Sequence, residues 1–462
     1  MKQALARLTE TTGLRRELGA WSAMAIVVGT VIGSGIFIVP NTMVQRVGSV
    51  EMVFAVWVVG GLLSLSGALS YAELSAALPG AGGEYVYLRE AYGPLWSFVY
   101  GWTQFWVAKS GSIATLATAF FLYFGNFWPT ARNVVAVVPL PIGPGGGPLE
   151  ITCGQLLAMA LILALGGVNF VGVKVGGGVQ VVVTVCKVGL IAFVVGFGLF
   201  SGHGRAANFA TAVPAAGGAV AFFAAMRAAL WAYDGWNNVS MVASEVRDPQ
   251  RNLPRSLIWG TLAVMGIYLA ANAAYFFVLP AGEVARSDLV AADMMGRILG
   301  PFGTSAVSVA AMISIFAALN GSILSGSRVP YAMAHDRYFF APAAEVHQRF
   351  HTPGVSILAL CGWSALVVLS GRYEDLFTYV IFASFILYGM TTAAVIVLRH
   401  TQPAMVRPYR TLGYPAVPLL FVVVSLGLVV STLIDKPRES LLGLGLIACG
   451  LPFYSHWNRR RI

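Results

Sequence analysis

Twelve long apolar stretches divide the chain, and this division constrains the fold more than any other feature of the sequence. A helix that crosses a bilayer needs about 20 apolar residues, and each stretch has this length or nearly so. Only 10% of the 462 residues are charged, whereas soluble proteins have roughly 25%. We therefore expect an all-α integral membrane protein with twelve transmembrane helices. The predicted spans lie near residues 20–40, 52–72, 94–126, 155–171, 178–200, 217–243, 257–279, 302–334, 354–370, 376–398, 412–434 and 440–457.

The basic residues predict how these spans are oriented. An even number of spans places both termini on one side of the membrane, and loops rich in Lys and Arg remain cytoplasmic. The side with both termini carries more than twice as many basic residues as the other side. We therefore expect a multi-pass protein of the cell (inner) membrane with cytoplasmic termini and no cleavable signal peptide. The net charge of +10 then reflects orientation and gives no reason to expect a nucleic acid partner.

Cysteine and histidine residues do not indicate a metal site, a cofactor or a disulfide framework. The four cysteines are far apart in the sequence and lie in or beside apolar spans. The six histidines lie in loops or at span ends, without the spacing of metal-binding motifs such as HExxH. We expect no metal ion and no cofactor.

An interruption occurs in the middle of the first span. Residues 26–40 read IVVGTVIGSGIFIVP, with Gly33-Ser34-Gly35 between two apolar segments. In a bilayer, backbone groups freed by such a break need partners from the protein or from a bound polar ligand. The GxxxG spacing of Gly29 and Gly33 offers another explanation, close packing against a second helix. This stretch alone leaves both explanations open.

A second interruption occurs in the sixth span. There, WAYDGWNNVSM places Asp234-Gly235 inside an apolar helix, with Asn237 and Asn238 directly after it. The two breaks are about 200 residues apart, as are two unusually long apolar segments, and such regularity is typical of internal repeats. Each half has five spans, an odd number, so the second half is expected to be inverted. The expected units are a cytoplasmic segment 1–18, repeats 19–200 and 201–400, and 401–462 with the last two spans and the C-terminus.

Two interrupted helices at matching positions of inverted halves indicate the substrate site of a secondary transporter. The N–H groups of Gly35, Ile36 and Phe37 would form a helix N-terminus suited to a carboxylate. Carbonyl groups around 30–32 and 231–234 would accept hydrogen bonds from an ammonium group. An α-amino acid carries both groups.

Other functions fit the sequence less well. A channel would need a selectivity filter or a ring motif, and an enzyme would need a constellation of catalytic groups. Neither pattern is visible. A receptor remains an alternative that binding without flux would reveal.

Two connecting segments carry expectations of their own. Residues 84–92 are predicted to form a short amphipathic helix along the membrane surface. Residues 127–150 end in the sequence PLPIGPGGGP, which is typical of a flexible connector.

Four motifs distributed over nearly the whole chain carry a family resemblance. They are VVGTVIGSGIF, YAELSAALPGAGGEYVYLREAYG, WAYDGWNNVSMVASEVRDPQRNLPRSL and ALNGSILSGSRVPYAMAHD. Together they resemble the amino acid-polyamine-organocation superfamily, and within it the L-type amino acid transporter family in its bacterial form. The resemblance implies a leucine-transporter fold with a 5+5 inverted repeat and broken helices 1 and 6. It also implies amino acid exchange by alternating access.

The same resemblance implies which residues form the substrate site. Ser34, Gly35 and Ile36 would hold the substrate carboxylate. Residues 231–234 would lie beside the ammonium group and the side chain, with polar and aromatic residues nearby. The full set is Ile32, Gly33, Ser34, Gly35, Ile36, Trp231, Ala232, Asp234, Asn237, Ser314, Phe382 and Phe385.

Lys187 is the expected coupling residue. A lysine near the centre of a span costs roughly 2.5–3.5 kcal/mol on insertion scales, so its side chain should face the protein interior. In the family resembled, a lysine at this place lies near the first break, where sodium-coupled relatives hold a cation. Its ammonium group would donate to carbonyls beside Gly33 and make transport sodium-independent. Proton-coupled symport and antiport of polyamines or cationic amino acids are the alternatives.

Departures from the family leave the substrate range open. Animal members pair with a glycoprotein through a cysteine in a stretch like residues 129–131, where this chain has Ala131. We therefore expect no disulfide-linked glycoprotein subunit. Lys109 stands where many relatives carry arginine or an uncharged residue, and Arg227 looks atypical for the family. Asp234 would either attract a cationic side chain or cap the break.

Overall fold

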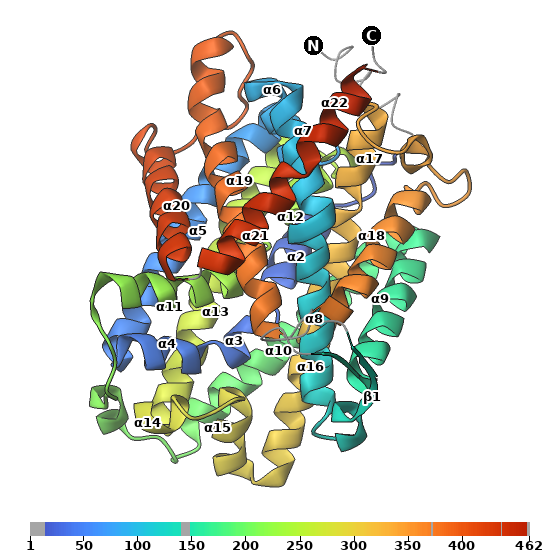
Figure 1. Ribbon diagram of the computed structural model, residues 1–462. Coiled ribbons are helices and arrows are strands. Elements are labelled where there is room, and N and C mark those ends of the chain that lie inside the picture. Colours follow the sequence, from blue (N-terminus) through green and yellow to red (C-terminus); the bar gives the residue numbers. More distant parts are fainter. Residues whose placement is uncertain (1–13, 140–147, 371–372, 436, 460–462) are drawn as a thin grey trace.

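The computed structural model describes residues 14–139, 148–370, 373–435 and 437–459, and nearly all of its elements are helices (Figure 1). Nine spans of these residues are long and apolar enough to cross a membrane. They consist of α2 (Ala20–Val31) with α3 (Gly35–Ile38), α5 (Val50–Ala77), α7 (Pro94–Thr103) with α8 (Lys109–Phe124), α9 (Cys153–Val171), α10 (Val173–Phe200), α13 (Pro249–Val278), α16 (Pro301–Gly326) with α17 (Arg328–His335), α19 (Tyr373–Thr401) and α20 (Ala416–Asp435).

Three further expected spans have shorter helices. The sixth and ninth correspond to α11 (Gly218–Tyr233) and α18 (Gly354–Val367), which are apolar but shorter than a full span. The twelfth is divided at Cys449 into α21 (Pro437–Ala448) and α22 (Gly450–Arg459). The described residues thus form a multi-pass membrane protein that is helical almost throughout, and the number of twelve crossings stays a prediction.

The remaining elements are short and connect the long helices. Two antiparallel strands, β1 (Val134–Val138) and β2 (Leu149–Thr152), overlap the segment 127–150 that was expected to be a flexible connector. Residues 140–147, most of its PLPIGPGGGP sequence, lie outside the described residues. The short helices are α4 (Pro40–Val47), α6 (Glu84–Tyr92), α12 (Asn238–Met241), α14 (Ala281–Val284) and α15 (Val290–Leu299), with single 3₁₀ turns at 129–132, 206–210, 243–245, 341–344 and 368–370.

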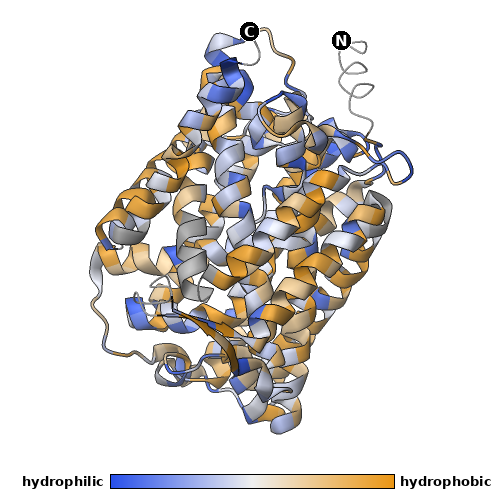
Figure 2. Ribbon diagram, turned by 45° about the vertical axis from the view of Figure 1, so that its right-hand side comes forward, coloured by the Kyte–Doolittle hydropathy of each residue, from blue (hydrophilic) through white to orange (hydrophobic). Residues whose placement is uncertain are grey.

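Large apolar side chains cover the outside of the bundle. Val182 and Val185 of α10 and Leu426 of α20 are between 63% and 67% exposed. Figure 2 shows hydrophobic residues along the sides of the bundle and hydrophilic residues concentrated toward its two ends. Water would disfavour an apolar surface of this extent, so these side chains are placed for contact with lipid.

Both described ends of the chain lie at the same end of the bundle. Leu14 packs against Tyr331 of α17, and Tyr454 of α22 stacks on Tyr338 with ring centroids 5.5 Å apart. In Figure 1, α17 and α22 lie together at the top of the bundle. An even number of crossings predicts this arrangement, while the cytoplasmic location of this end stays a prediction.

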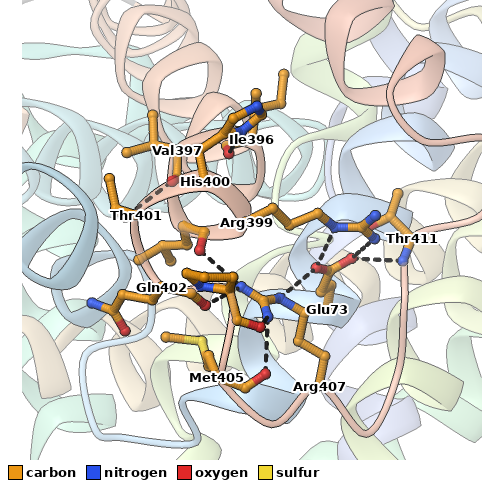
Figure 3. A network of polar contacts seen from close by, with 12 residues as sticks. Glu73, Ile396, Val397, Arg399, His400, Thr401, Gln402, Met405, Arg407 and Thr411 are labelled. Atoms are coloured by element: carbon orange, nitrogen blue, oxygen red, sulfur yellow. Dashed lines mark hydrogen bonds and ion pairs between the residues drawn. The ribbon is translucent and has the colours of Figure 1, made fainter.

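A network of charges joins α5 to α19 near one end of the bundle (Figure 3). The carboxylate of Glu73 accepts two hydrogen bonds from Arg399, at 2.9 and 2.6 Å. It also pairs with Arg407 at 3.3 Å and accepts from the backbone N–H of Thr411 at 2.7 Å. Since Glu73 is almost completely buried, these partners replace the water that the carboxylate loses on folding. The chain that follows α19 is thereby fixed to the end of α5.

Helix α6 forms at the residues expected, but the expectation that it lies along the surface is wrong for its first turns. Glu84, Tyr85 and Tyr87 are completely buried. The reason is that the Glu84 carboxylate accepts a hydrogen bond from Asn237, a residue of the second break. A polar residue can be buried when a partner satisfies it, and hydrophobic periodicity does not reveal that partner.

Both expected helix breaks are present, and glycine and polar residues form them. Helix α2 ends at Val31 and α3 begins at Gly35, while α11 ends at Tyr233 and α12 begins at Asn238. Gly235 has φ +106°, a backbone conformation that residues with a Cβ rarely adopt. Helix α2 packs against α10, α13 and α16, so the first break lies inside the bundle.

Candidate substrate site

One cavity lies between the two breaks. Its walls come from the first break, the second break, α8 and α16. The lining residues are Thr30, Val31, Gly33, Ser34, Gly35, Ser112, Leu116, Trp231, Asp234, Gly235, Asn238 and Ser322. The cavity is thus bordered by exposed backbone, hydroxyl groups, one carboxylate and one amide, which suits a small polar molecule.

Buried side chains satisfy the backbone carbonyls freed at the first break. The ammonium group of Lys187, which is completely buried, donates to the carbonyl oxygens of Gly29 and Ile32, at 2.6 Å each. Ser314 donates to the same Ile32 oxygen at 3.0 Å. The hydroxyl of Tyr268 donates to the carbonyl of Val31 at 2.9 Å. Since lipid offers no donors, these three side chains stabilise the broken conformation.

Two of the carbonyls that were expected to be free for a substrate are therefore engaged. The Ile32 oxygen accepts from both Lys187 and Ser314. The Val31 oxygen accepts from Tyr268 and from the N–H of Gly33. A carbonyl oxygen has two lone pairs, so both oxygens have their full number of donors. The expectation of free carbonyl groups is wrong for these two residues.

The two breaks are in direct contact with each other. The hydroxyl oxygen of Thr30 lies 2.9 Å from the carbonyl oxygen of Gly235 and 2.6 Å from that of Ile26, so its single proton is shared between these two carbonyls. The Tyr268 hydroxyl also lies 2.7 Å from the carbonyl oxygen of Ala232, so its single proton is shared between the carbonyls of Val31 and Ala232 and joins α2 to α11. A Cβ atom added to Gly35 would lie 2.6 Å from the Cα of Ala232, closer than real Cβ contacts allow. The absence of a side chain at Gly35 therefore permits the approach of the two broken helices.

Packing and site formation, the two explanations for the glycines of the first break, apply to different glycines. A Cβ added to Gly29 would lie 2.1 Å from the side-chain amide of Gln180 in α10, so Gly29 serves close helix packing. Gly33 borders the cavity, and its added Cβ would lie 3.2 Å from Leu116 in the cavity wall.

Side chains hold the second break. The carboxylate of Asp234 accepts from the hydroxyl of Tyr388 at 2.8 Å. The side-chain oxygen of Asn238 accepts from the ammonium group of Lys109 at 2.7 Å. On the neighbouring residue, the amide of Asn237 donates to Glu84. Burial raises the pKa of the Glu84 carboxyl, and the hydrogen bond from Asn237 opposes that change.

The expected site residues divide into two groups. Gly33, Ser34, Gly35, Trp231 and Asp234 border the cavity. The others are buried around it without being part of its lining, namely Ile32, Ile36, Ala232, Asn237, Ser314, Phe382 and Phe385. Phe385 contacts the ring of Phe421, and Phe382 lies beside Gly443, so both aromatic residues pack toward the last helices of the chain.

Sequence reasoning missed several partners of the site. Tyr268 and Tyr388 lie in none of the four motifs, and although Glu84 lies in one, the sequence does not show its partner. Each of the three contacts residues far away in the chain. Lys109 did stand out, because a charge within an apolar span needs a polar partner, but nothing in the sequence identified Asn238 as that partner.

In the part of the chain that the structure describes, this site has no cluster of metal ligands and no cluster of cysteines. The described residues contain no group of three or more His, Cys, Asp or Glu side chains that could hold a metal ion. Ala131, at the position where animal relatives are expected to carry their linking cysteine, is buried in the turn Pro129–Arg132. The expected lack of a disulfide-linked glycoprotein subunit stays a prediction.

Comparison with known proteins identifies the family. Residues 18–443 match the amino acid permease family. The chain is 33% identical over 456 residues to the serine/threonine exchanger SteT of Bacillus subtilis (strain 168), covering 98% of this chain and 99% of that protein. It is 32% identical over 449 residues to the human b(0,+)-type amino acid transporter 1, covering 96% and 88%. It is 31% identical over 456 residues to the mouse Asc-type amino acid transporter 1, covering 96% and 82%. The chain therefore belongs to the amino acid permease family, a family of membrane transporters and not of enzymes.

Proposed function

We propose that this protein is a sodium-independent amino acid exchanger that works by alternating access. In this proposal it has the leucine-transporter fold, with twelve crossings, inverted repeats at 19–200 and 201–400, and cytoplasmic termini. The cavity between the two breaks supports the position of the substrate site. The names of the relatives, among them a serine/threonine exchanger, support amino acids as the substrates and exchange as the mode.

The contact of Lys187 with the first break is the observation that carries the proposal. The side-chain nitrogen of Lys187 is fixed between the carbonyls of Gly29 and Ile32 by two hydrogen bonds of 2.6 Å. Backbone carbonyls of a broken helix are the groups that coordinate Na⁺ in sodium-coupled transporters. With a lysine ammonium bound to them, these carbonyls need no sodium ion, so transport proceeds without a sodium gradient.

The cavity offers complementary groups for the two ends of an α-amino acid. The substrate carboxylate would bind at the N–H groups near Ser34, Gly35 and Ile36, where the second half of the first broken helix begins. The ammonium group and the side chain would lie toward Trp231 and Asp234. The other expected site residues lie outside the cavity lining and would support these groups from there. They are Ile32, Ala232, Asn237, Ser314, Phe382 and Phe385.

Transport by purified protein in liposomes tests this proposal. Uptake of labelled alanine should require unlabelled amino acid inside the vesicles and should be equal in sodium and choline buffers. Uptake that needs a sodium gradient contradicts the role given to Lys187. Uptake driven by an imposed proton gradient into empty vesicles supports proton symport instead, and binding without any flux supports a receptor.

A competition panel then defines the substrates. Unlabelled small neutral, large neutral and cationic amino acids, together with polyamines, compete against labelled alanine in the same vesicles. We expect amino acids and not polyamines to compete. Activity of the purified chain alone would also show that transport needs no glycoprotein subunit.

A further inference from the structure

Lys109 is buried, and the elements around it hold its side chain in position. Its side chain is 4% exposed. It follows a π-helical turn, Gln104–Ala108, in which the backbone N–H of Lys109 donates to the carbonyl of Gln104. Its aliphatic stem passes over Gly326 of α16, where an added Cβ would lie 2.4 Å from the Lys109 Cγ. π-Helical turns occur frequently at functional sites, and this one directs Lys109 toward the second break.

Among the described residues, the charged groups that interact at the second break are Lys109, Asp234 and Glu84. Lys109 donates to Asn238 at 2.7 Å and interacts electrostatically with both Asp234 and Glu84. The ion pairs of the described residues include none of these three groups within 4.0 Å. Of the three, only Asp234 borders the cavity. Lys109 therefore does not line the cavity, whereas Asn238, which accepts its hydrogen bond, does.

From this arrangement we infer that Lys109 is a specificity-determining residue, the fixed counter-charge that sets how strongly the Asp234 carboxylate attracts a cationic side chain of the substrate. This inference rests on the proposed function. It concerns the selectivity of the site and not its ability to transport.

The inference follows from the cost of burying charge. A carboxylate taken out of water is stable when another charge or several hydrogen bonds compensate it. Around Asp234 the protein supplies a hydrogen bond from the Tyr388 hydroxyl, a hydrogen bond from the backbone N–H of Gly235, and the charge of Lys109 as the compensating cation. Without Lys109, a lysine or arginine substrate would be the cation that compensates Asp234, and a neutral substrate would leave the carboxylate without one. Removal of Lys109 should thus favour cationic substrates over neutral ones.

Inhibition of alanine exchange in proteoliposomes tests this inference. The probes are unlabelled lysine and unlabelled serine, each competing with labelled alanine, and the readout is the ratio of their half-inhibitory concentrations. Lys109→Met removes the charge, Lys109→Gln removes the charge but retains an N–H donor for Asn238, and Lys109→Arg retains the charge. We expect Met and Gln to lower the lysine-to-serine ratio by about tenfold, and Arg to leave it nearly unchanged.

Asp234→Asn completes the test. In the double variant Lys109→Met/Asp234→Asn, the ratio should return to that of Asp234→Asn alone, because there is no carboxylate left to compensate. An unchanged ratio in folded Lys109→Met, or equal shifts in the Met and Arg variants, overturns the inference. Failure of both the Met and Gln variants to fold, measured by size-exclusion chromatography in detergent, assigns Lys109 to the fold and also overturns it.

Failure of the proposed function looks different. In that case the unmodified protein exchanges no amino acid at all, and the competition experiment has no signal. The selectivity of Lys109→Met is then measured by the thermal stabilisation that lysine and serine give to each purified variant, with the same expected order.

Discussion

The two broken helices meet at one cavity, yet the protein satisfies them in different ways. At the first break, Lys187, Ser314 and Tyr268 donate to backbone carbonyls. At the second break, Tyr268 and Thr30 contact the carbonyls of Ala232 and Gly235. In addition, Tyr388 and Lys109 contact the side chains of Asp234 and Asn238.

This difference separates two tasks of the site. A backbone carbonyl is the same group whichever residue carries it, so contacts to it fix geometry. A side-chain carboxylate or amide can be changed by one substitution, so contacts to it adjust charge and shape. In the proposed function, the first break thus positions the substrate backbone, and the second break selects the substrate side chain.

The largest loss of exchange is expected when the side chain of Lys187 is removed, which tests the role given to the first break. Lys187→Ala should reduce exchange below detection, because the Gly29 and Ile32 carbonyls lose a donor that lipid cannot replace. The measurement is amino acid exchange in proteoliposomes, with folded protein quantified by size-exclusion chromatography.

Val185→Ala is the control, since Val185 lies on the same helix and is 67% exposed. It should leave exchange unchanged. If Lys187→Ala exchanges amino acids at a rate close to that of the unmodified protein, the first break does not depend on this contact.

The second largest loss of exchange is expected from a substitution where the two breaks approach each other closely. Gly35→Ala places a Cβ against Ala232 of α11, and overpacking of this kind costs about 1–3 kcal/mol. We expect a loss of exchange of at least about tenfold and a lower melting temperature. Gly189→Ala in α10 is the matched control, because an added Cβ there meets nothing within 4 Å. Equal behaviour of the two variants would falsify the contact.

The breaks could be predicted from the sequence because the signal is local. Gly33-Ser34-Gly35 and Asp234-Gly235 interrupt apolar segments, and the observed ends of the helices lie within three residues of them. The long apolar segments likewise predict the helical bundle, because their lengths match a bilayer.

The partners of the breaks could not be predicted in the same way. Tyr388 contacts Asp234 across 154 residues and Glu84 contacts Asn237 across 153, and a single sequence contains no pattern that joins such positions. The burial of Glu84 follows from one of these contacts, so the surface location expected for α6 was wrong for the same reason. The depth of Lys187 in its span did predict an interior position, while its partner carbonyls came from the family resemblance.

Asp234 allows the role of the second break to be tested directly. Asp234→Asn should weaken competition by lysine by about tenfold, because a hydrogen bond to a charged group contributes about 1.5–3 kcal/mol. Competition by alanine should change much less. The measurement is the pair of half-inhibitory concentrations against labelled alanine. If both amino acids lose affinity equally, Asp234 caps the break and does not recognise the side chain.

The smallest effect is expected from the partner of Asp234 on α19. Tyr388→Phe removes the hydroxyl that donates to the carboxylate at 2.8 Å and leaves the ring in place. The freed lone pair can then accept from the ammonium group of a lysine side chain. A neutral hydrogen bond contributes about 0.5–1.5 kcal/mol, so competition by lysine should strengthen by about two- to tenfold relative to alanine.

The direction of this change distinguishes the two interpretations of Asp234. If the carboxylate recognises a cationic side chain, Tyr388→Phe and Asp234→Asn shift the lysine-to-alanine ratio in opposite directions. If it only caps the break, both variants weaken exchange and the ratio does not move. Tyr92→Phe is the control, since its hydroxyl also donates to α19, at the Met390 carbonyl, but Tyr92 does not border the cavity. The ratio in Tyr92→Phe should equal that of the unmodified protein, and a shift there equal to that of Tyr388→Phe would show that movement of α19, and not the contact with Asp234, controls selectivity.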